Sequence, residues 1–179
     1  MNNIAQIIQG NSPEGKTLND TGEGTIFFQG KTDFDFRFPK PRIYTTAPYR
    51  LAKKFDTLLS VRAPVGDVNM AFENCCIGRG LAAIQSDYPS FIFYTMKRLK
   101  KFLEKRGGIG TTFDSITKDE ILKLKICIPP KQFIKKFESL AKKFDEEIFT
   151  KSAENNLLEN LRDFLLPMLM NGQVSFKKE

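Results

Sequence analysis

Phosphate binding by a glycine-rich loop is the first chemistry that the residue types and spacing indicate. Residues 10–17, GNSPEGKT, match the pattern G-x-x-x-x-G-K-[ST], in which backbone amides, a lysine and a hydroxyl hold nucleotide phosphates. That chemistry needs a helix directly after the loop. The next seven residues, LNDTGEG, instead contain two glycines and several turn-formers. We therefore expect a surface loop with Lys16 at a cationic tip, and the alternative is an NTPase that uses Lys16 and Thr17.

The other reactive residue types restrict catalysis further. The chain contains no histidine, which removes histidine-based triads, histidine-ligated metals and the commonest general base near neutral pH. Of the three cysteines, Cys75 and Cys76 are adjacent and Cys127 stands in an apolar run. This spacing supports neither a disulfide framework nor a zinc site. We expect no catalytic residue and no metal ligand in this chain.

The positive charge lies mainly in the first part of the chain. The net charge is +7, and residues 1–130 carry 19 Lys and Arg against 13 Asp and Glu, whereas residues 131–179 carry 9 against 8. A basic body with a balanced tail predicts that the body binds a polyanion and that the tail binds protein. The alternative is that the extra lysines serve solubility alone.

Composition predicts a soluble globular protein of the cytoplasm. Hydrophobic residues make up 41% of the 179 residues and charged residues 27%. No run of about eighteen apolar residues occurs, and residues 1–9 lack the basic and apolar regions of a signal peptide. No contact with a membrane is expected.

Residues 1–130 have the pattern of a mixed α/β domain. The helix expected over Ser90–Lys105 has apolar residues at three- and four-residue steps, and the capping-box spacing of Thr117 and Glu120 predicts a short helical turn. A strand or helical turn is expected at Ile4–Ile8. Strands are predicted at Thr25–Gln29, Leu58–Arg62, Cys76–Ile77, Leu81–Ile84 and Leu124–Ile128.

The C-terminal part predicts one long helix. Lys131–Leu166 contains no glycine or proline, Pro167 and Gly172 mark the expected end, and the length is about 50 Å at ~1.5 Å per residue. An apolar stripe predicts a coiled-coil arm, with Asn155 on its seam to fix the register; the alternative is a helix folded over its own domain. The expected interface residues are Phe133, Phe137, Leu140, Phe144, Ile148, Asn155, Leu158, Leu161 and Leu165.

Seven strings occur in order along the chain, and their order and spacing carry a resemblance over nearly its whole length. They are GNSP at residues 10–13, GEGTIFFQGKTDF at 22–34, KPRIYTTAP at 40–48, DTLLSVRAPVGDVNMA at 56–71, CCIGRGLAAI at 75–84, GTTFDSITKDEILKLKICIPP at 110–130 and LRDFLLPMLMNGQV at 161–174. This series closely resembles the specificity subunit of type I restriction-modification enzymes.

The resemblance implies an α+β protein without catalytic activity: a DNA target recognition domain, residues 1–130, and a helical spacer, residues 131–179. The family's usual subunit has two such units in tandem, and this chain has one. Met1 and the full spacer favour a half-subunit that pairs with itself as a homodimer over a piece of a longer or split gene. A second, different specificity half-subunit is the other possible mate.

The resemblance further implies an antiparallel pairing of two spacers, so that a homodimer would read a two-part palindrome in double-stranded DNA. Methyltransferase subunits, and a restriction motor subunit where one exists, would dock on the spacer, with Leu157, Phe164 and Leu166 as candidate contacts. Those partners would hold S-adenosylmethionine, ATP and magnesium, and this chain would bind no cofactor. The remaining alternative is a coiled-coil adaptor without specific DNA binding.

Candidate DNA contacts follow from side-chain chemistry, since Arg and Lys suit guanine and phosphate, and Asn and Gln suit adenine. For each, the alternative is a solvated or structurally paired side chain. Arg62 and Arg79 lie in strings that recur in the family whatever sequence is read, which favours a scaffold role for them. The loop candidates are Lys16, Gln29, Lys31, Arg42, Tyr44, Arg62, Asn69, Arg79 and Thr112. The candidate backbone contacts are Arg98, Lys101, Lys105 and Arg106.

Overall fold

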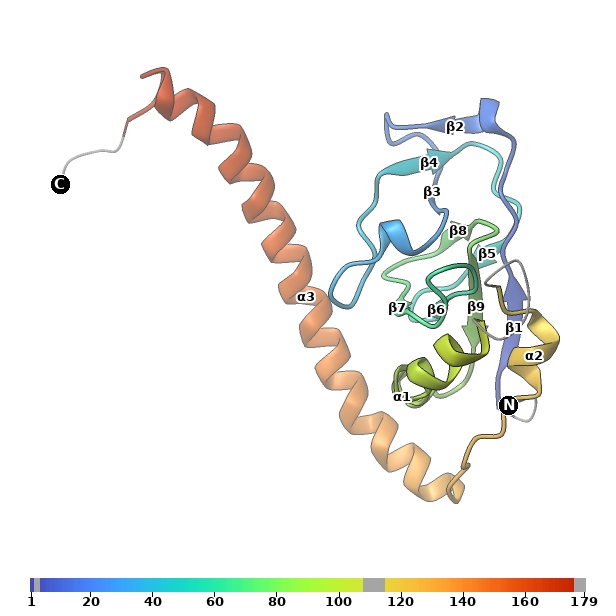
Figure 1. Cartoon of the computed structure of the whole chain (residues 1–179). Helices are drawn as coiled ribbons and strands as arrows, with labels where there is room; N and C mark the ends of the chain where they lie inside the picture. The colour runs from blue at the N-terminus through green and yellow to red at the C-terminus, as the bar shows by residue number, and fades with distance from the viewer. Residues whose placement is uncertain (2–3, 108–114, 176–179) are drawn as a thin grey trace. The chain divides into compact units, whose positions relative to one another are not determined.

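Two β-sheets lie at the centre of the first part of the chain (Figure 1). The computed structural model describes residues 1, 4–107 and 115–175. The first sheet is antiparallel throughout and has the order β1 (Gln6–Gln9), β9 (Leu81–Gln85), β6 (Thr57–Ser60) and β7 (Val68–Met70). The second has the order β2 (Leu18–Asn19), β4 (Ile43–Thr45), β3 (Thr25–Phe28), β8 (Cys75–Ile77) and β5 (Leu51–Ala52). Its β3–β8 pair is parallel and its other pairs are antiparallel.

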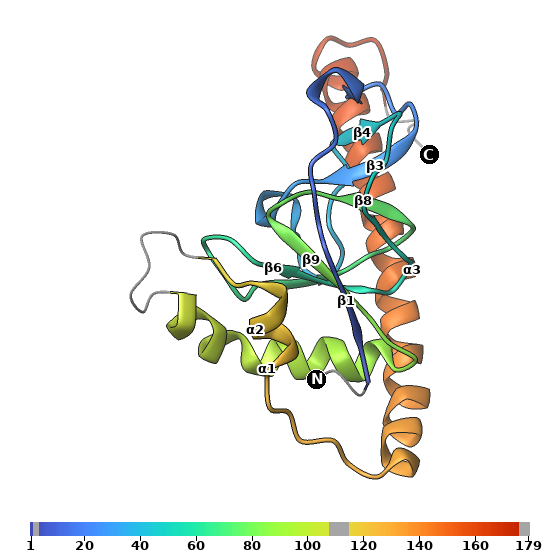
Figure 2. The ribbon, with the colours of Figure 1, turned by 90° about the vertical axis from the view of Figure 1, so that its right-hand side faces the viewer.

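The first sheet is buried on both faces. On β6, Leu59 faces helices α1 (Pro89–Gly107) and α2 (Lys118–Leu122), whereas Leu58 packs with Phe28 and Ile77 of the second sheet. Figure 2 shows the resulting three layers, with α1 and α2 on one side of β1, β9 and β6 and the second sheet on the other. Because both faces are covered, the central strands are almost continuously apolar. This is why the sequence signal for these strands was clear.

The predicted mixed α/β fold is confirmed, including the helix over Ser90–Lys105, which is α1. The capping box also forms: Thr117 Oγ1 accepts a hydrogen bond from Glu120 N at 3.4 Å, and Glu120 Oε2 accepts one from Thr117 N at 2.7 Å. The predicted strand at Leu124–Ile128 is wrong, because this segment is an irregular connection. Leu124 is buried, but Ile128 is exposed. A short apolar run between lysines does not separate a strand from an extended link.

One helix, α3 (Lys131–Met170), forms the C-terminal part. It is 40 residues long, or about 60 Å, and it continues through Pro167 rather than ending there. Gly172, at φ +70°, follows its C-terminus. The chain divides into two compact units, Met1–Lys142 and Lys143–Glu179, so the first turns of α3 belong to the same unit as the two sheets.

Those first turns of α3 pack against α1. The side chains of Ile134 and Ala141 are buried. The ring of Phe137 meets Phe91 and Tyr94 edge to face, with centroid separations of 6.3 and 5.9 Å. Phe137, one of the residues of the predicted apolar stripe, therefore packs against α1 of the same chain. None of the helices in the described residues combines the length and apolar character needed to cross a bilayer.

Candidate nucleic-acid interface

The loop that matches a nucleotide-binding pattern does not have its geometry. After β1 the chain forms a loop, one turn of 3-10 helix, η1 (Gly15–Thr17), and then strand β2 instead of a helix. The Thr17 hydroxyl donates to the Glu14 carbonyl at 2.7 Å and lies 3.0 Å from Thr45 Oγ1. Lys16 is exposed and pairs with Glu14 at 2.7 Å. The arrangement is the surface loop with a cationic tip that the sequence predicts.

A hollow in the second sheet brings two predicted DNA contacts together, Gln29 and Arg42. Gln29 follows β3, and Arg42 precedes β4, which pairs with β3. The hollow has a volume of about 360 Å³, and we call it the Arg42 hollow. It is lined by Leu18, Asn19, Asp20, Phe27, Gln29, Asp33, Arg42 and Ile43.

The buried carboxylate of Asp33 fixes the geometry of this hollow. Its Oδ2 accepts hydrogen bonds from the backbone amides of Gln29 at 2.8 Å and Gly30 at 3.3 Å. Its Oδ1 accepts from Arg42 Nε at 3.1 Å and also pairs with Arg42 Nη2. Asp33 thus joins the end of β3 to the Arg42 guanidinium, which remains 58% exposed. An arginine oriented in this way is prepared to donate to an acceptor outside the protein.

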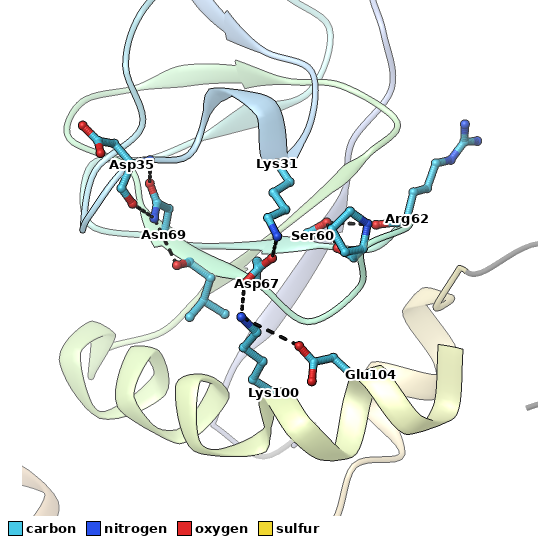
Figure 3. Close-up of polar contacts among 10 residues, drawn as sticks. Lys31, Asp35, Ser60, Arg62, Asp67, Asn69, Lys100 and Glu104 are labelled. Carbon is cyan, nitrogen blue, oxygen red and sulfur yellow. Dashed lines mark hydrogen bonds and ion pairs between the residues drawn. The ribbon is translucent and has the colours of Figure 1, made fainter. Parts of the chain in front are cut away.

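Lys31 and Lys100 share one carboxylate, that of Asp67 (Figure 3). Lys31 comes from η2 (Lys31–Asp33), and Lys100 comes from α1 and lies 2.5 Å from Asp67 Oδ1. Partial burial raises the pKa of Asp67, but hydrogen bonds from Lys100 and Lys31 outweigh that effect and place it below its usual 3.8. Lys31 was predicted to contact DNA, and here it links η2 to the loop between β6 and β7.

Asn69 has a structural role. Its side chain is 2% exposed. Oδ1 accepts from the Asp35 amide at 3.2 Å, while Nδ2 donates to the carbonyls of Asp35 at 2.9 Å and Val68 at 3.1 Å (Figure 3). These bonds use the donors and the acceptor that would read adenine. The burial of Asn69 therefore argues against the prediction that it contacts a base.

Arg62 and Arg79 line a second hollow, of about 310 Å³, which we call the two-arginine hollow. Arg62 follows β6, and Arg79 lies in the turn between β8 and β9. Both side chains are exposed. The other residues around the hollow are Gln9, Gly10, Asn11, Val61, Ser115, Ile116 and Thr117.

Tyr44, Arg98 and Lys101 are not among the residues that line these two hollows. Tyr44, in β4, is half-buried against the core between the sheets. Arg98 and Lys101 are exposed on α1. Thr112 and the side chains of Lys105 and Arg106 lie outside the described residues.

Most of the predicted pairing face on α3 is exposed. Phe133, Leu140 and Phe144 are between 55% and 62% exposed. Ile148 and Leu165 are half-buried, Asn155 is exposed, and Leu158 and Leu161 are 56% and 52% exposed. The expected docking residues Leu157, Phe164 and Leu166 are exposed to a similar degree. The exposed fractions alone do not distinguish the residues predicted to pair with a second helix from those predicted to dock a methyltransferase.

The chain belongs to the type I restriction modification DNA specificity domain family, whose model matches residues 2–160. It is 38% identical, over 96% of its length, to the proposed specificity subunit of the type I restriction enzyme MjaX from Methanocaldococcus jannaschii, and covers 41% of that protein. It is 27% identical to the HindI specificity subunit of Haemophilus influenzae, over 73% of the chain and 29% of that subunit. The chain thus spans less than half the length of these relatives.

Solved structures agree with this assignment. The chain is similar to the HsdS subunit from Thermoanaerobacter tengcongensis, with a TM-score of 0.68 and 34% identity over 96% of this chain and 44% of that one. It is also similar to a chain from a study of complex assembly and conformational transition of the type I R-M system. That match has a TM-score of 0.71 and 35% identity over 93% of this chain and 43% of the other. The mixed α/β domain and the long C-terminal helix predicted from the sequence match the fold of these proteins; the pairing of that helix with a second one remains a prediction.

Several residues at the site carry no signal in the sequence that would reveal their role. Asp33 orients Arg42, yet nine positions separate them and no periodic pattern relates them. Gln9 and Asn11 line the two-arginine hollow because β1 leads into the loop that lies on the β8–β9 turn. The GNSP string at residues 10–13 carries part of the family resemblance, and the fold places its residues Asn11 and Ser12 beside Arg79.

Proposed function

We propose that this chain is a non-catalytic DNA-recognition half of a type I specificity subunit, which reads one half of a bipartite site. The observation that carries the proposal is the Arg42 hollow, in which the buried carboxylate of Asp33 holds an exposed guanidinium beside the exposed amide of Gln29. An arginine fork suits guanine, and a glutamine amide suits adenine, in the major groove. These two residues are the proposed base contacts.

Cationic side chains outside this hollow supply the proposed phosphate contacts. Lys16 lies at a loop tip, and Arg98 and Lys101 lie on the exposed face of α1; Lys105 and Arg106 complete this set from the sequence. Neutralising several phosphates releases counterions, so affinity should fall steeply as salt rises. Binding that does not depend on salt would contradict this assignment.

The α3 helix is the proposed spacer. Its apolar side chains beyond Lys142, such as Phe144, Leu158 and Leu161, are exposed along a helix that needs a mate to cover them. The mate that we favour is a second copy in antiparallel orientation. The helix after Lys142 is about 40 Å long at ~1.5 Å per residue, close to one turn of DNA at roughly 34 to 36 Å. Half-sites about one turn apart are therefore expected.

Methyltransferase subunits are the proposed further partners. S-adenosylmethionine would be bound by them, and ATP and magnesium by a motor subunit, rather than by this chain. The residues proposed to meet them are Leu157, Phe164 and Leu166, which are exposed on α3. A complex that forms equally well after all three are changed to serine would contradict this docking site.

The test is selection of bound duplexes from random DNA by the purified chain together with its methyltransferase, with the mass of the complex measured in parallel. We expect two short motifs in inverted orientation with a fixed gap, and two copies of the chain in each complex. Recovery of no preferred sequence would favour a coiled-coil adaptor. If the chain is a strict monomer, both alone and with the methyltransferase, the half-subunit proposal is overturned.

Nucleotide titration of the isolated chain tests the NTPase alternative, which requires that the chain bind nucleotide in the absence of DNA.

A further inference from the structure

Backbone contacts hold the two loops that carry Arg62 and Arg79 in a fixed arrangement. The Val61 amide donates to the Gly80 carbonyl at 2.9 Å, so the residues next to the two arginines are joined directly. The Ile116 amide donates to the Val61 carbonyl at 2.9 Å on the other side. The Ser60 hydroxyl contacts the carbonyls of Arg62 at 3.0 Å and Pro64 at 2.8 Å, which closes the loop after β6. The two-arginine hollow is therefore formed before any ligand arrives.

Close backbone approaches make this arrangement rigid. A Cβ atom on Gly10 would lie 2.1 Å from the Gly78 carbonyl oxygen, and one on Gly80 would lie 2.6 Å from the Gln29 carbonyl oxygen. The backbone of the loop before η1 and the backbone at the end of β3 thus both lie in close contact with the β8–β9 turn. Arg79, between the two glycines of that turn, is left with its side chain in solvent.

The charge of the hollow is uncompensated in the part of the chain that the structure describes. Lys31, Lys100 and Arg42 each pair with a carboxylate. Arg62 and Arg79 form no ion pair with any residue in 1, 4–107 or 115–175, and no acidic residue of these ranges lines the hollow. Figure 3 shows the Arg62 side chain extended away from the Lys31–Asp67–Lys100 cluster.

We propose that Arg62 and Arg79 together hold one phosphate of the DNA backbone without regard to base sequence. The inference rests on the proposed function, because it names a further contact with the same DNA. Guanidinium forks bind phosphate oxygens in bidentate geometry. Asn11 and Ser115, which also line the hollow, are neutral hydrogen-bonding residues of the types that contact phosphates, whereas the Thr117 hydroxyl already donates to Glu120 Oε2 at 2.8 Å. A rigid phosphate-binding site of this kind would fix the position of the DNA duplex along the protein, while Arg42 and Gln29 contact the bases.

The experiment uses the full chain with its methyltransferase, a duplex of the selected sequence and a scrambled duplex of equal length. The test variant is Arg62→Gln combined with Arg79→Gln. We expect it to bind both duplexes about tenfold to a hundredfold more weakly, by the same factor. The slope of log affinity against log salt should become shallower by about one for each bound copy. The preferred sequence should not change.

Two further variants isolate the cause. Arg62→Lys with Arg79→Lys keeps both charges, so it should retain most of the affinity that the glutamine variant loses. Lys135→Gln with Lys136→Gln removes two exposed charges on α3 and should cost much less than the test variant. Circular dichroism and urea unfolding confirm that each variant is folded.

A scan of single neutral methylphosphonates along the selected duplex locates the contact. One position in each half-site should weaken binding of the unchanged chain and have no effect on the glutamine variant. The inference is overturned if that variant binds both duplexes as the unchanged chain does, if its base preference shifts, or if it keeps DNA binding and loses the methyltransferase instead. If the unchanged chain prefers neither duplex and binds no DNA, the proposed function has failed first.

Discussion

The carboxylate of Glu138 accepts hydrogen bonds at 3.0 Å from the backbone amide of Ser90 and from the amide that follows it. Glu138 lies on α3, and Ser90 lies in the first turn of α1. A carboxylate at the N-terminus of a helix accepts hydrogen bonds from amides that have no partner within the helix, and its negative charge interacts favourably with the positive end of the helix dipole. The start of the proposed spacer is thereby attached to a helix that packs on the first sheet.

Replacing Glu138 should loosen this attachment. We expect Glu138→Ala to lower the free energy of unfolding by about 1 to 2 kcal/mol, because two helix amides lose their acceptor. Glu138→Gln should cost less, since its carbonyl can still accept one of the bonds. The measurement is urea unfolding, with Glu147→Ala on an exposed part of α3 as control. Equal stability of all three variants would show that the contact contributes nothing.

Asp67 makes stability depend on pH. Its folded pKa lies below the usual 3.8, because hydrogen bonds from Lys100 and Lys31 outweigh the effect of burial. Its contribution is therefore present above the unfolded pKa and is lost as the pH falls through the lower folded pKa. Since Lys31 and Lys100 are more than a third exposed, we expect only about 1 kcal/mol.

Asp67→Asn tests this pH dependence. Thermal or urea unfolding should show the variant less stable than the unchanged chain at pH 6, with the difference shrinking as the pH falls below about 4. Asp87→Asn, at an exposed position, serves as the control. A difference of the same size at every pH would mean that the charge of Asp67 is not the cause.

Asn69→Ala should damage the fold and leave recognition unchanged. The substitution removes one acceptor and two donors from a buried site, which leaves the backbone of Asp35 without its partner. We expect the free energy of unfolding to fall by about 1 to 3 kcal/mol. Urea unfolding measures the loss, and DNA selection checks the preferred sequence. A fully stable variant with a changed base preference would restore Asn69 as a base contact.

Arg42 should discriminate bases. We expect Arg42→Ala to relax the preference at one base pair of each half-site by about 1 to 3 kcal/mol and to leave the other positions unchanged. Asp33→Asn, which releases the guanidinium, should relax the same position and also reduce stability. Competition binding with duplexes substituted one pair at a time measures both effects. Uniform weakening across all sequences would instead identify Arg42 as a phosphate contact.

The length of α3 should set the gap between half-sites. Removing about one helical turn after Lys142 shortens the helix by roughly 5 Å, which corresponds to one or two base pairs. Selection from random DNA with the shortened chain should return the same half-site motifs with a smaller gap. A variant that prefers the original gap would refute the role of α3 as a spacer.

The sequence predicted those features that leave a continuous apolar run bounded by turn residues or a long stretch free of helix breakers. Leu58 and Leu59 point to opposite cores, so β6 appears as a continuous apolar run, and α3 was predicted from a long stretch without glycine or proline. The predicted strand at Leu124–Ile128 was wrong because only part of this short apolar segment is buried: Leu124 is covered and Ile128 is exposed, and the sequence alone does not show this difference. The structural role of Asn69 could not be predicted, because its chemistry suits a base while its burial depends on hydrogen bonds to Asp35, which is distant in the sequence.

In the proposed function the two sheets have different roles, and this has a consequence for how such a protein could change. Gln29 and Arg42 flank strands of the second sheet, whereas α1, which holds the start of α3 through Glu138, packs on the first sheet. Substitutions next to the strands of the second sheet leave the Glu138 contacts that attach the proposed spacer unchanged. If the proposed base contacts and the proposed spacer evolve separately, the DNA target could change while the distance between half-sites stays the same, or the distance could change while the target stays the same.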